Sequence, residues 1–378
     1  MIAATAGLLL ALLAAGLLER RARDLAHLRL PVRIHVNGTR GKSTVTRQIA
    51  AALREAGVRT LAKTTGAAPR LILPDGTERS VRRLAPASIR EQLWVQREAV
   101  RQGASALVLE CMAVDPGLQA VSEHEMVRAT IGVVTNVRLD HGDVMGTTVD
   151  EVGEALSATV PRSAVLVVGP SAGLGAIERS AAARGTRVVR ASSAPGGPGH
   201  DEPDWMADNI AIALAVTREL GIADDVALRG IRAATPDPGA VERGLVTIGA
   251  RQVGYLDATS ANDPESLLRV LGTRVSGAQF VFNHRADRPF RLRQFADLPP
   301  WPRGDDTLIV TGDRPDWLTW RRVRAALGPE RLSFCPLGRL PRALAGCAPE
   351  PAEPRLVVFC GNSKGFERRR LLDALTRG

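Results

Sequence analysis

The sequence predicts an α/β protein with two domains, each built on a mostly parallel sheet, and one N-terminal membrane helix before them. Three observations lead to this prediction. Short apolar runs alternate with helical patterns along most of the chain, which is typical of parallel strands covered on both faces. Residues 2–18 carry no charge. The segment Pro236-Asp237-Pro238-Gly239 interrupts the strand–helix alternation, which starts again after it.

We therefore expect a transmembrane anchor at residues 1–19, a larger α/β domain at 20–238 and a smaller Rossmann-like α/β domain at 239–378. As a helix, the uncharged run spans about 26 Å, against a hydrocarbon core of about 30 Å. Its basic residues, Arg20 and Arg21, follow the apolar run, whereas a secretory signal carries them before it. By the positive-inside rule we expect a single-pass protein of the cell (inner) membrane with cytoplasmic domains. A buried N-terminal helix and a signal peptide are the alternatives.

The composition excludes some classes of protein. Hydrophobic residues make up 45% of the 378 residues, so the chain is not disordered. The formal charge of +10 would suit nucleic acid, but aromatic residues are only 3% and the arginines are spread along the whole chain. We expect no nucleic-acid partner. Four cysteines without CxxC spacing favour free thiols in a reducing compartment.

The first domain opens with a strand, a glycine loop and a helix. An alternating strand at residues 32–36 precedes the loop, and residues 45–56 have a helical pattern. Glycines let backbone N–H groups approach phosphates, a helix N-terminus favours anions, lysine adds a compact charge, and the following serine can ligate Mg²⁺. A glycine-rich turn with a chance lysine is the alternative. The candidate phosphate ligands are Asn37, Gly38, Thr39, Arg40, Gly41, Lys42, Ser43 and Thr44.

Further polar residues follow the other strands of this domain. Thr64 follows a strand at residues 58–62, Glu110 follows one at 105–109, and Asp140 and His141 come soon after one at 130–134. Ligands bind at the carboxyl edge of an open parallel sheet, so we expect these side chains to meet Lys42 there. Ser43, Thr64, Glu110 and His141 are the candidate metal ligands. A structural salt bridge for Glu110, a hydrogen-bond network for His141 and acceptor binding for Thr64 are the alternatives.

The remaining elements continue the alternation. Helical patterns cover residues 89–101, 149–159 and 205–220, and the last carries Asn209. Residues 164–168 form another strand, and residues 190–204 form a glycine- and proline-rich surface excursion. In the second domain, strands are expected at 255–258, 280–282, 307–310 and 355–359.

In this order, the motifs resemble those of the Mur ligase superfamily, ATP-dependent amide ligases that include the folylpolyglutamate synthases. The loop is similar to that family's shortened GTNGK[ST] loop, and Glu110 to its magnesium-binding glutamate. Residues 136–143 resemble its N-x-x-x-DH-x-D segment, in which the histidine, here His141, is a second metal ligand. Asn209 stands where the family has an asparagine that contacts adenine. Residues 260–266 and 361–367 resemble two motifs of its C-terminal domain.

The resemblance extends to one branch, the catalytic subunits of poly-γ-glutamate synthases, through KTTGAAPR, ECMAV, LDHGDVMG and TPDPGA. It implies γ-linked polymerisation of glutamate through an acyl phosphate, with ATP and Mg²⁺ or Mn²⁺, and Lys42, Glu110 and His141 as catalytic residues. It also implies that the growing chain, the membrane and other membrane subunits are partners. We expect Arg285, Asp287 and Arg288 of the second domain to close over the nucleotide, and a charged solvent-facing loop is the alternative.

Two departures from the superfamily narrow this expectation. Too few residues precede the first strand for a UDP-sugar domain, which disfavours peptidoglycan precursors as substrates. No lysine lies between Gly66 and Ser363, so the carbamylated lysine of many Mur ligases is absent. A folylpolyglutamate-type ligase and a membrane-tethered ATPase or coupling subunit without ligase activity remain as alternatives.

Overall fold

The computed structural model describes residues 2–66, 68–83, 86–192, 204–237, 240–248, 251–261, 263–272, 277–297, 306–346 and 356–362. The chain forms two compact units, Met1–Asp237 and Pro238–Gly378. Pro238, Gly239, Asn262, Lys364 and most of the excursion at 190–204 belong to sequence motifs noted above but lie outside the described residues.

Unit 1 is built on a sheet of eight described strands. Two short strands at one edge pair antiparallel, and the other six run parallel, as the sequence predicts. In sheet order the strands are β4 (Glu78–Ser80), β3 (Arg70–Ile72), β2 (Thr60–Lys63), β5 (Ala106–Glu110), β1 (Val32–Asn37), β6 (Ile131–Val134), β7 (Val165–Val168) and β8 (Arg187–Arg190). The segments after β2, β5, β1 and β6 therefore leave the sheet side by side at one edge.

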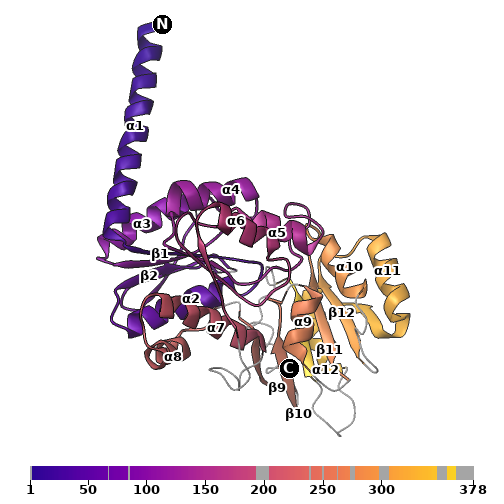
Figure 1. Ribbon diagram of the computed structural model, residues 1–378. Helices are drawn as coiled ribbons and strands as arrows, with labels where there is room; N and C mark the ends of the chain where they lie inside the picture. The colour runs from indigo at the N-terminus through magenta and orange to yellow at the C-terminus, as the bar shows by residue number, and fades with distance from the viewer. Residues whose placement is uncertain are drawn as a thin grey trace. The chain divides into compact units, whose positions relative to one another are not determined.

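Helices cover both faces of this sheet (Figure 1). One face carries α2 (Lys42–Glu55), α7 (Asp204–Glu219) and α8 (Asp224–Ala233). The other carries α3 (Glu91–Arg101), α5 (Val149–Ser157), α6 (Gly175–Ala183) and α4 (Pro116–Ala120), which continues into a π-helix, η1 (Val121–Val127). Helices α2 and α8 pack closely because Gly230 has no side chain: a Cβ there would lie 2.6 Å from Ala52 Cα.

The two faces of the central strand β1 differ in chemistry. Ile34 and Val36 are fully buried in the apolar core against α2, α7 and α8. Because side chains alternate along a strand, Arg33, His35 and Asn37 point to the opposite face, where His35 and Asn37 are buried and Arg33 is half-buried. The strand is thus buried on both sides, with an apolar face and a polar face.

Helix α1 (Ile2–Arg29) projects from unit 1 (Figure 1). The helix continues through Glu19, Arg20 and Arg21, and its last turn contacts the domain. The transmembrane helix expected at residues 1–19 is not found: within the described part of the chain, no helix is both long and apolar enough to cross a membrane.

Unit 2 is a smaller α/β unit with a six-stranded sheet among its described residues. Only β9 pairs antiparallel. In sheet order the strands are β13 (Leu332–Phe334), β12 (Thr307–Gly312), β11 (Gln279–His284), β14 (Leu356–Gly361), β10 (Arg251–Asp257) and β9 (Glu242–Ile248). The helices are α9 (Pro264–Leu271), α10 (Pro289–Asp297), α11 (Trp317–Leu327) and α12 (Leu340–Gly346).

Candidate active site

The glycine loop between β1 and α2 is held by the residues that follow β6. Thr135 Oγ1 donates a 2.6 Å hydrogen bond to the carbonyl of Arg40. The side-chain oxygen of Asn136 accepts from Thr39 Oγ1 at 2.7 Å and from Arg40 N at 3.0 Å. Gly38 has a φ of 125°, and a Cβ there would lie 2.1 Å from Thr135 Oγ1, so only glycine fits. The neighbouring strand end thus fixes the shape of the loop.

Lys42 begins α2 and points back over the loop. Its Nζ donates to the carbonyls of Gly38 at 2.6 Å and Thr39 at 3.3 Å. Gly41 is the N-cap of α2 with a φ of 79°, and a Cβ there would lie 2.6 Å from Asn209 Oδ1. Asn209 on α7 therefore packs directly on the loop, while Thr44 lies half-buried in the first turn of α2. The sequence reasoning identified each of these residues.

Three segments bring hydroxyl and carboxylate oxygens together beside the loop. Ser43 Oγ donates to Glu110 Oε2 at 2.8 Å, and the backbone N–H of Thr65 donates to the same oxygen at 2.7 Å. Glu110 is only 3% exposed at the end of β5. Thr64 is fully buried after β2, and its hydroxyl has no hydrogen-bond partner within the described chain. Hard oxygen ligands of this kind suit Mg²⁺.

The sequence reasoning missed two residues beside this group. A Cβ at Gly66 would lie 3.0 Å from Ser43 Oγ and 3.7 Å from Asp237 Oδ2, so the carboxylate of Asp237 borders the site. Arg47 on α2 lies with its Nε 3.7 Å from the same Asp237 oxygen and also pairs with Glu78 on β4. In the sequence, Asp237 was notable only as part of the predicted domain boundary at residues 236–239. No local pattern links it to α2.

His141 lies after β6 in a left-handed backbone conformation, with a φ of 47°. Its Nε2 is 3.8 Å from Asp140 Oδ2, and Asp140 accepts a 2.8 Å hydrogen bond from the side chain of Arg40. The contacts described for His141 do not join it to Glu110. Among the described residues, no three His, Cys, Asp or Glu side chains gather as a metal cluster. Metal binding by His141 stays a prediction.

Arg285, Asp287 and Arg288 lie in unit 2, between β11 and α10. The Arg285 guanidinium donates to Asp287 Oδ2 at 2.5 Å, and the N–H of Arg288 donates to the Arg285 carbonyl at 3.0 Å. This turn is therefore internally fixed. Its contact with a nucleotide bound to unit 1 stays a prediction.

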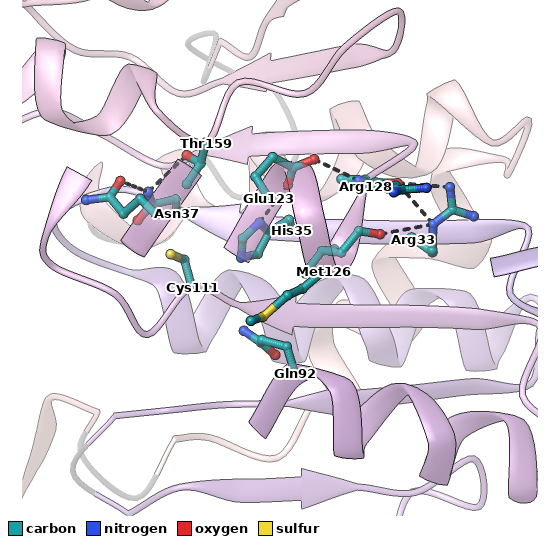
Figure 2. Close-up of polar contacts among 12 residues, drawn as sticks. Arg33, His35, Asn37, Gln92, Cys111, Glu123, Met126, Arg128 and Thr159 are labelled. Carbon is teal, nitrogen blue, oxygen red and sulfur yellow. Dashed lines mark hydrogen bonds and ion pairs between the residues drawn. The ribbon is translucent and has the colours of Figure 1, made fainter. Parts of the chain in front are cut away.

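Behind the loop, the polar face of β1 forms a buried hydrogen-bonded row, shown in Figure 2. Asn37, a candidate phosphate ligand, turns its side chain to this face. Its Nδ2 donates to Gln119 Oε1 at 2.9 Å and to Thr159 Oγ1 at 3.0 Å. At the other end of the strand, the Arg33 guanidinium donates to the carbonyls of Leu30 and Arg128. The side chain of Asn37 anchors the strand from which the loop departs.

His35 lies at the centre of this row. Its Nδ1 is 2.7 Å from Glu123 Oε2, and Glu123 Oε1 accepts from the N–H of Ala129 at 2.8 Å. Cys111, which directly follows Glu110, lies beside His35 in Figure 2. Burial opposes the charged imidazolium, but the neighbouring Cys111 and the hydrogen bond and charge of Glu123 outweigh it and raise the pKa of His35 to about 10. His35 is therefore protonated at neutral pH.

Lys63, at the end of β2, is fully buried, and its Nζ is 2.8 Å from Glu91 Oε2. Arg83 donates to both oxygens of Glu91. Burial lowers the pKa of Lys63, and its hydrogen bond to Glu91 opposes that effect. This lysine is held in an ion pair beneath the site.

Comparisons with known proteins identify relatives of this chain. Residues 36–164 match the model of the Mur ligase middle domain, and residues 245–377 match that of the poly-gamma-glutamate synthase CapB C-terminal domain. The chain is 38% identical to PGA synthase CapB of Bacillus subtilis (strain 168) over 312 residues, which cover 79% of each protein. It is 36% identical to the capsule biosynthesis protein CapB of Bacillus anthracis, over 78% of this chain and 66% of that protein.

A solved structure of Mycobacterium tuberculosis folylpolyglutamate synthase, complexed with ADP and AMPPCP, is similar in fold. The TM-score is 0.64 with 17% identity, over 92% of this chain and 91% of that one. At this identity the likeness concerns the fold alone.

Proposed function

We infer the activity of this chain from its family: it belongs to the CapB family of poly-γ-glutamate synthases. It is an ATP-dependent amide ligase that makes poly-γ-glutamate. The observation in the structure that supports this conclusion is the place of the loop lysine, Lys42, directly before Ser43, whose hydroxyl binds Glu110 at one edge of the sheet. The folylpolyglutamate alternative is less well supported, because the chain resembles that enzyme in fold at only 17% identity.

We assign charge neutralisation on ATP to Lys42 and to the backbone N–H groups of the loop. In the structure the ammonium donates to the Gly38 carbonyl, on the inner side of the loop. A rotation about its side-chain bonds would exchange that carbonyl for phosphate oxygens. Asn209, packed against Gly41, keeps the first turn of α2 in place. Phosphoryl transfer depends chiefly on such positioning and charge stabilisation.

Ser43, Thr64 and Glu110 are the proposed ligands of Mg²⁺ or Mn²⁺. The residues fit a hard cation: two are hydroxyls, one is a carboxylate, and the Thr64 hydroxyl is buried without a hydrogen-bond partner in the described chain. The bound cation would neutralise charge on the phosphates. We also propose His141 as a ligand of the cation. The loop after β6 would bring its side chain to the cation, since the contacts of His141 in the structure do not join it to Glu110.

The ligation itself follows from the chemistry of amides. A glutamate carboxylate in water does not condense with an amine unless it is activated, so its γ-carboxylate would take the γ-phosphoryl group of ATP and form an acyl phosphate with release of ADP. The amine of the next glutamate then displaces phosphate and forms the amide. Arg285, Asp287 and Arg288 of unit 2 are proposed to close over the nucleotide and exclude water during this exchange.

We also propose that the enzyme works at the cytoplasmic side of the cell membrane, where ATP and glutamate are available. Exposed leucines on α1, followed by Arg20 and Arg21, support this placement. Membrane subunits that receive the growing chain are the proposed partners. This association does not require α1 to span the bilayer.

The test is ADP release with and without glutamate, followed by sizing of labelled product. Glutamate-dependent ADP release with an anionic polymer supports the synthase, whereas ADP release without glutamate or polymer would identify an ATPase. Lys42→Met should lower ADP release by at least about 10²-fold, the usual cost of removing a group that stabilises the transition state. Arg229→Gln, in a surface ion pair on α8, is the matched loss of one positive charge and should retain full activity.

A further inference from the structure

A groove lies between α1 and α3, and no residue of the glycine loop lines it. Its volume is about 460 Å³. Figure 1 shows α1 leaving unit 1 beside α3, so the groove lies at the base of the projecting helix. It is lined by Leu18, Glu19, Ala22, Arg23 and Ala26 from α1, and by Arg90, Leu93, Gln96 and Arg97 at and along α3.

The walls of this groove are fixed by contacts beneath it. His27 Nε2 lies 3.1 Å from Gln96 Oε1 and 3.0 Å from the carbonyl of Met126. Asp24 pairs with Arg128 at 3.2 Å, which ties the last turns of α1 to the end of η1. The groove is therefore a built feature of unit 1, because the two helices are joined by polar contacts on its inner side.

The groove carries positive charge that the described chain does not neutralise. The side chains of Arg23, Arg90 and Arg97 form no ion pair or hydrogen bond with any described residue, and Glu19 is the only acidic residue in the lining. The Nε of Arg23 is buried without a partner. By contrast, Arg101 on the same α3 pairs with Glu98. Buried N–H groups of a guanidinium need an acceptor, and anionic oxygens bind them most strongly.

Apolar side chains continue from the groove along α1. Leu9, Leu10, Leu12, Leu13, Leu17 and Leu18 are each more than half exposed, and they point to several sides of the helix. On α3, Trp94 follows the lining residue Leu93 in sequence and is 44% exposed. An apolar segment followed by guanidinium groups and an aromatic side chain is the arrangement of residues at a membrane–water interface.

We propose that this groove binds the phosphate headgroup of an anionic membrane lipid, whose acyl chains lie along the leucines of α1. A polyanion such as the glutamate polymer would also neutralise the arginines, but it would leave the leucines in water. A lipid satisfies both features at once. The proposal rests on the membrane association proposed above and is independent of the ligase chemistry.

The test uses the full chain and a short-chain phosphatidylglycerol kept below its micelle concentration. Binding is followed by tryptophan fluorescence, and Trp94→Phe assigns the signal to α3. We expect saturable binding, with far weaker binding of the matching phosphatidylcholine and of inorganic phosphate. Arg90→Gln/Arg97→Gln should weaken phosphatidylglycerol binding at least about tenfold, since two charge-assisted hydrogen bonds are lost.

Arg179→Gln/Arg232→Gln is the matched control, because it removes two positive charges from other helices of unit 1 and should leave the affinity unchanged. ADP release by both double variants should equal that of the unmodified chain, which separates this site from the ligase. Equal binding of the two lipids, or unchanged binding by the groove variant, would overturn the proposal. Tighter binding of inorganic phosphate, or displacement of the lipid by a glutamate oligomer at lower concentration, would assign the groove to those anions instead.

Discussion

Replacing Glu123 with alanine should destabilise unit 1 strongly, although Glu123 lies outside the glycine loop. Its carboxylate is the partner of His35 at 2.7 Å and also accepts the N–H of Ala129 at 2.8 Å. Both members of the pair are almost wholly buried. The substitution leaves the imidazolium and the backbone N–H without an acceptor, in a place that water reaches only if the structure opens.

The size of the effect follows from that burial. Removing one partner of a buried ion pair costs about 3–5 kcal/mol. For a unit of this length, each kcal/mol lowers the melting temperature by about 2–4 °C, so Glu123→Ala should lower it by roughly 6–20 °C. Glu123→Gln keeps an acceptor for Ala129 and removes only the charge, so its effect should be smaller.

The effect should also depend on pH. The pKa of His35 is raised from 6.5 to about 10 in the folded chain, so the folded state binds a proton that the unfolded state releases. This stabilisation is complete below pH 6.5 and is lost as pH rises towards 10. The difference in melting temperature between the unmodified chain and Glu123→Gln should therefore narrow over that range.

Scanning calorimetry of the full chain at several pH values measures both effects. Glu154→Ala is the control, because its ion pair with Arg179 is mostly exposed and should contribute less than about 1 kcal/mol. A Glu123→Ala variant with the melting temperature of this control would refute the assignment of a stabilising buried pair. If the difference in melting temperature between the unmodified chain and Glu123→Gln stays constant with pH, the protonated state of His35 is refuted.

Three further predictions concern the site and its support. Gly38→Ala should reduce nucleotide affinity at least about tenfold in calorimetric titration, because its Cβ would collide with Thr135 and the φ of 125° favours glycine. Glu110→Gln should raise the Mg²⁺ concentration needed for half-maximal ADP release about tenfold. Replacing a carboxylate outside the proposed metal site should leave that concentration unchanged. Thr148→Ala removes the capping box of α5 and should cost about 1 kcal/mol in thermal unfolding with unchanged turnover.

The elements around the glycine loop could be predicted from the sequence because their signals are local. The alternation at residues 32–36, the glycines of the loop and the helical pattern that follows correspond to β1, the loop and α2. Glu110 was placed at a strand end by the apolar run before it. Parallel pairing of β1 with β5 and β6 then brings those ends together, as the preference for ligands at the carboxyl edge predicts.

Other features depend on contacts between distant residues. Strands β3 and β4 have three residues each, too few for a periodic pattern, so the pairing of Glu78 with Arg47 could not be anticipated. The end of helix α1 could not be predicted for a related reason. Hydropathy marks where the uncharged run ends, but the helix itself continues to Arg29, because residues after the run remain good helix formers and bind the domain.

The polar face of β1 shows a further limit of sequence patterns. Alternating apolar and polar residues usually indicate a strand with one face in water. Here both faces are covered, because Arg33, His35 and Asn37 find partners on α4, η1 and the chain after α1. A pattern records that a side chain is polar, but it does not record whether its partner is water or another residue.

The glycine motif therefore predicts the phosphate site but contains only some of the residues that form it. Its glycines and Lys42 are local, yet Thr135 and Asn136 hold the loop from the end of β6, and Asn37 is anchored behind it by Gln119. If these distant partners were replaced, a chain with an unchanged motif could still lose the loop conformation seen here. Hydrogen bonds from Thr135 and Asn136, rather than a closer match to a motif, are the physical reason that the loop has one shape.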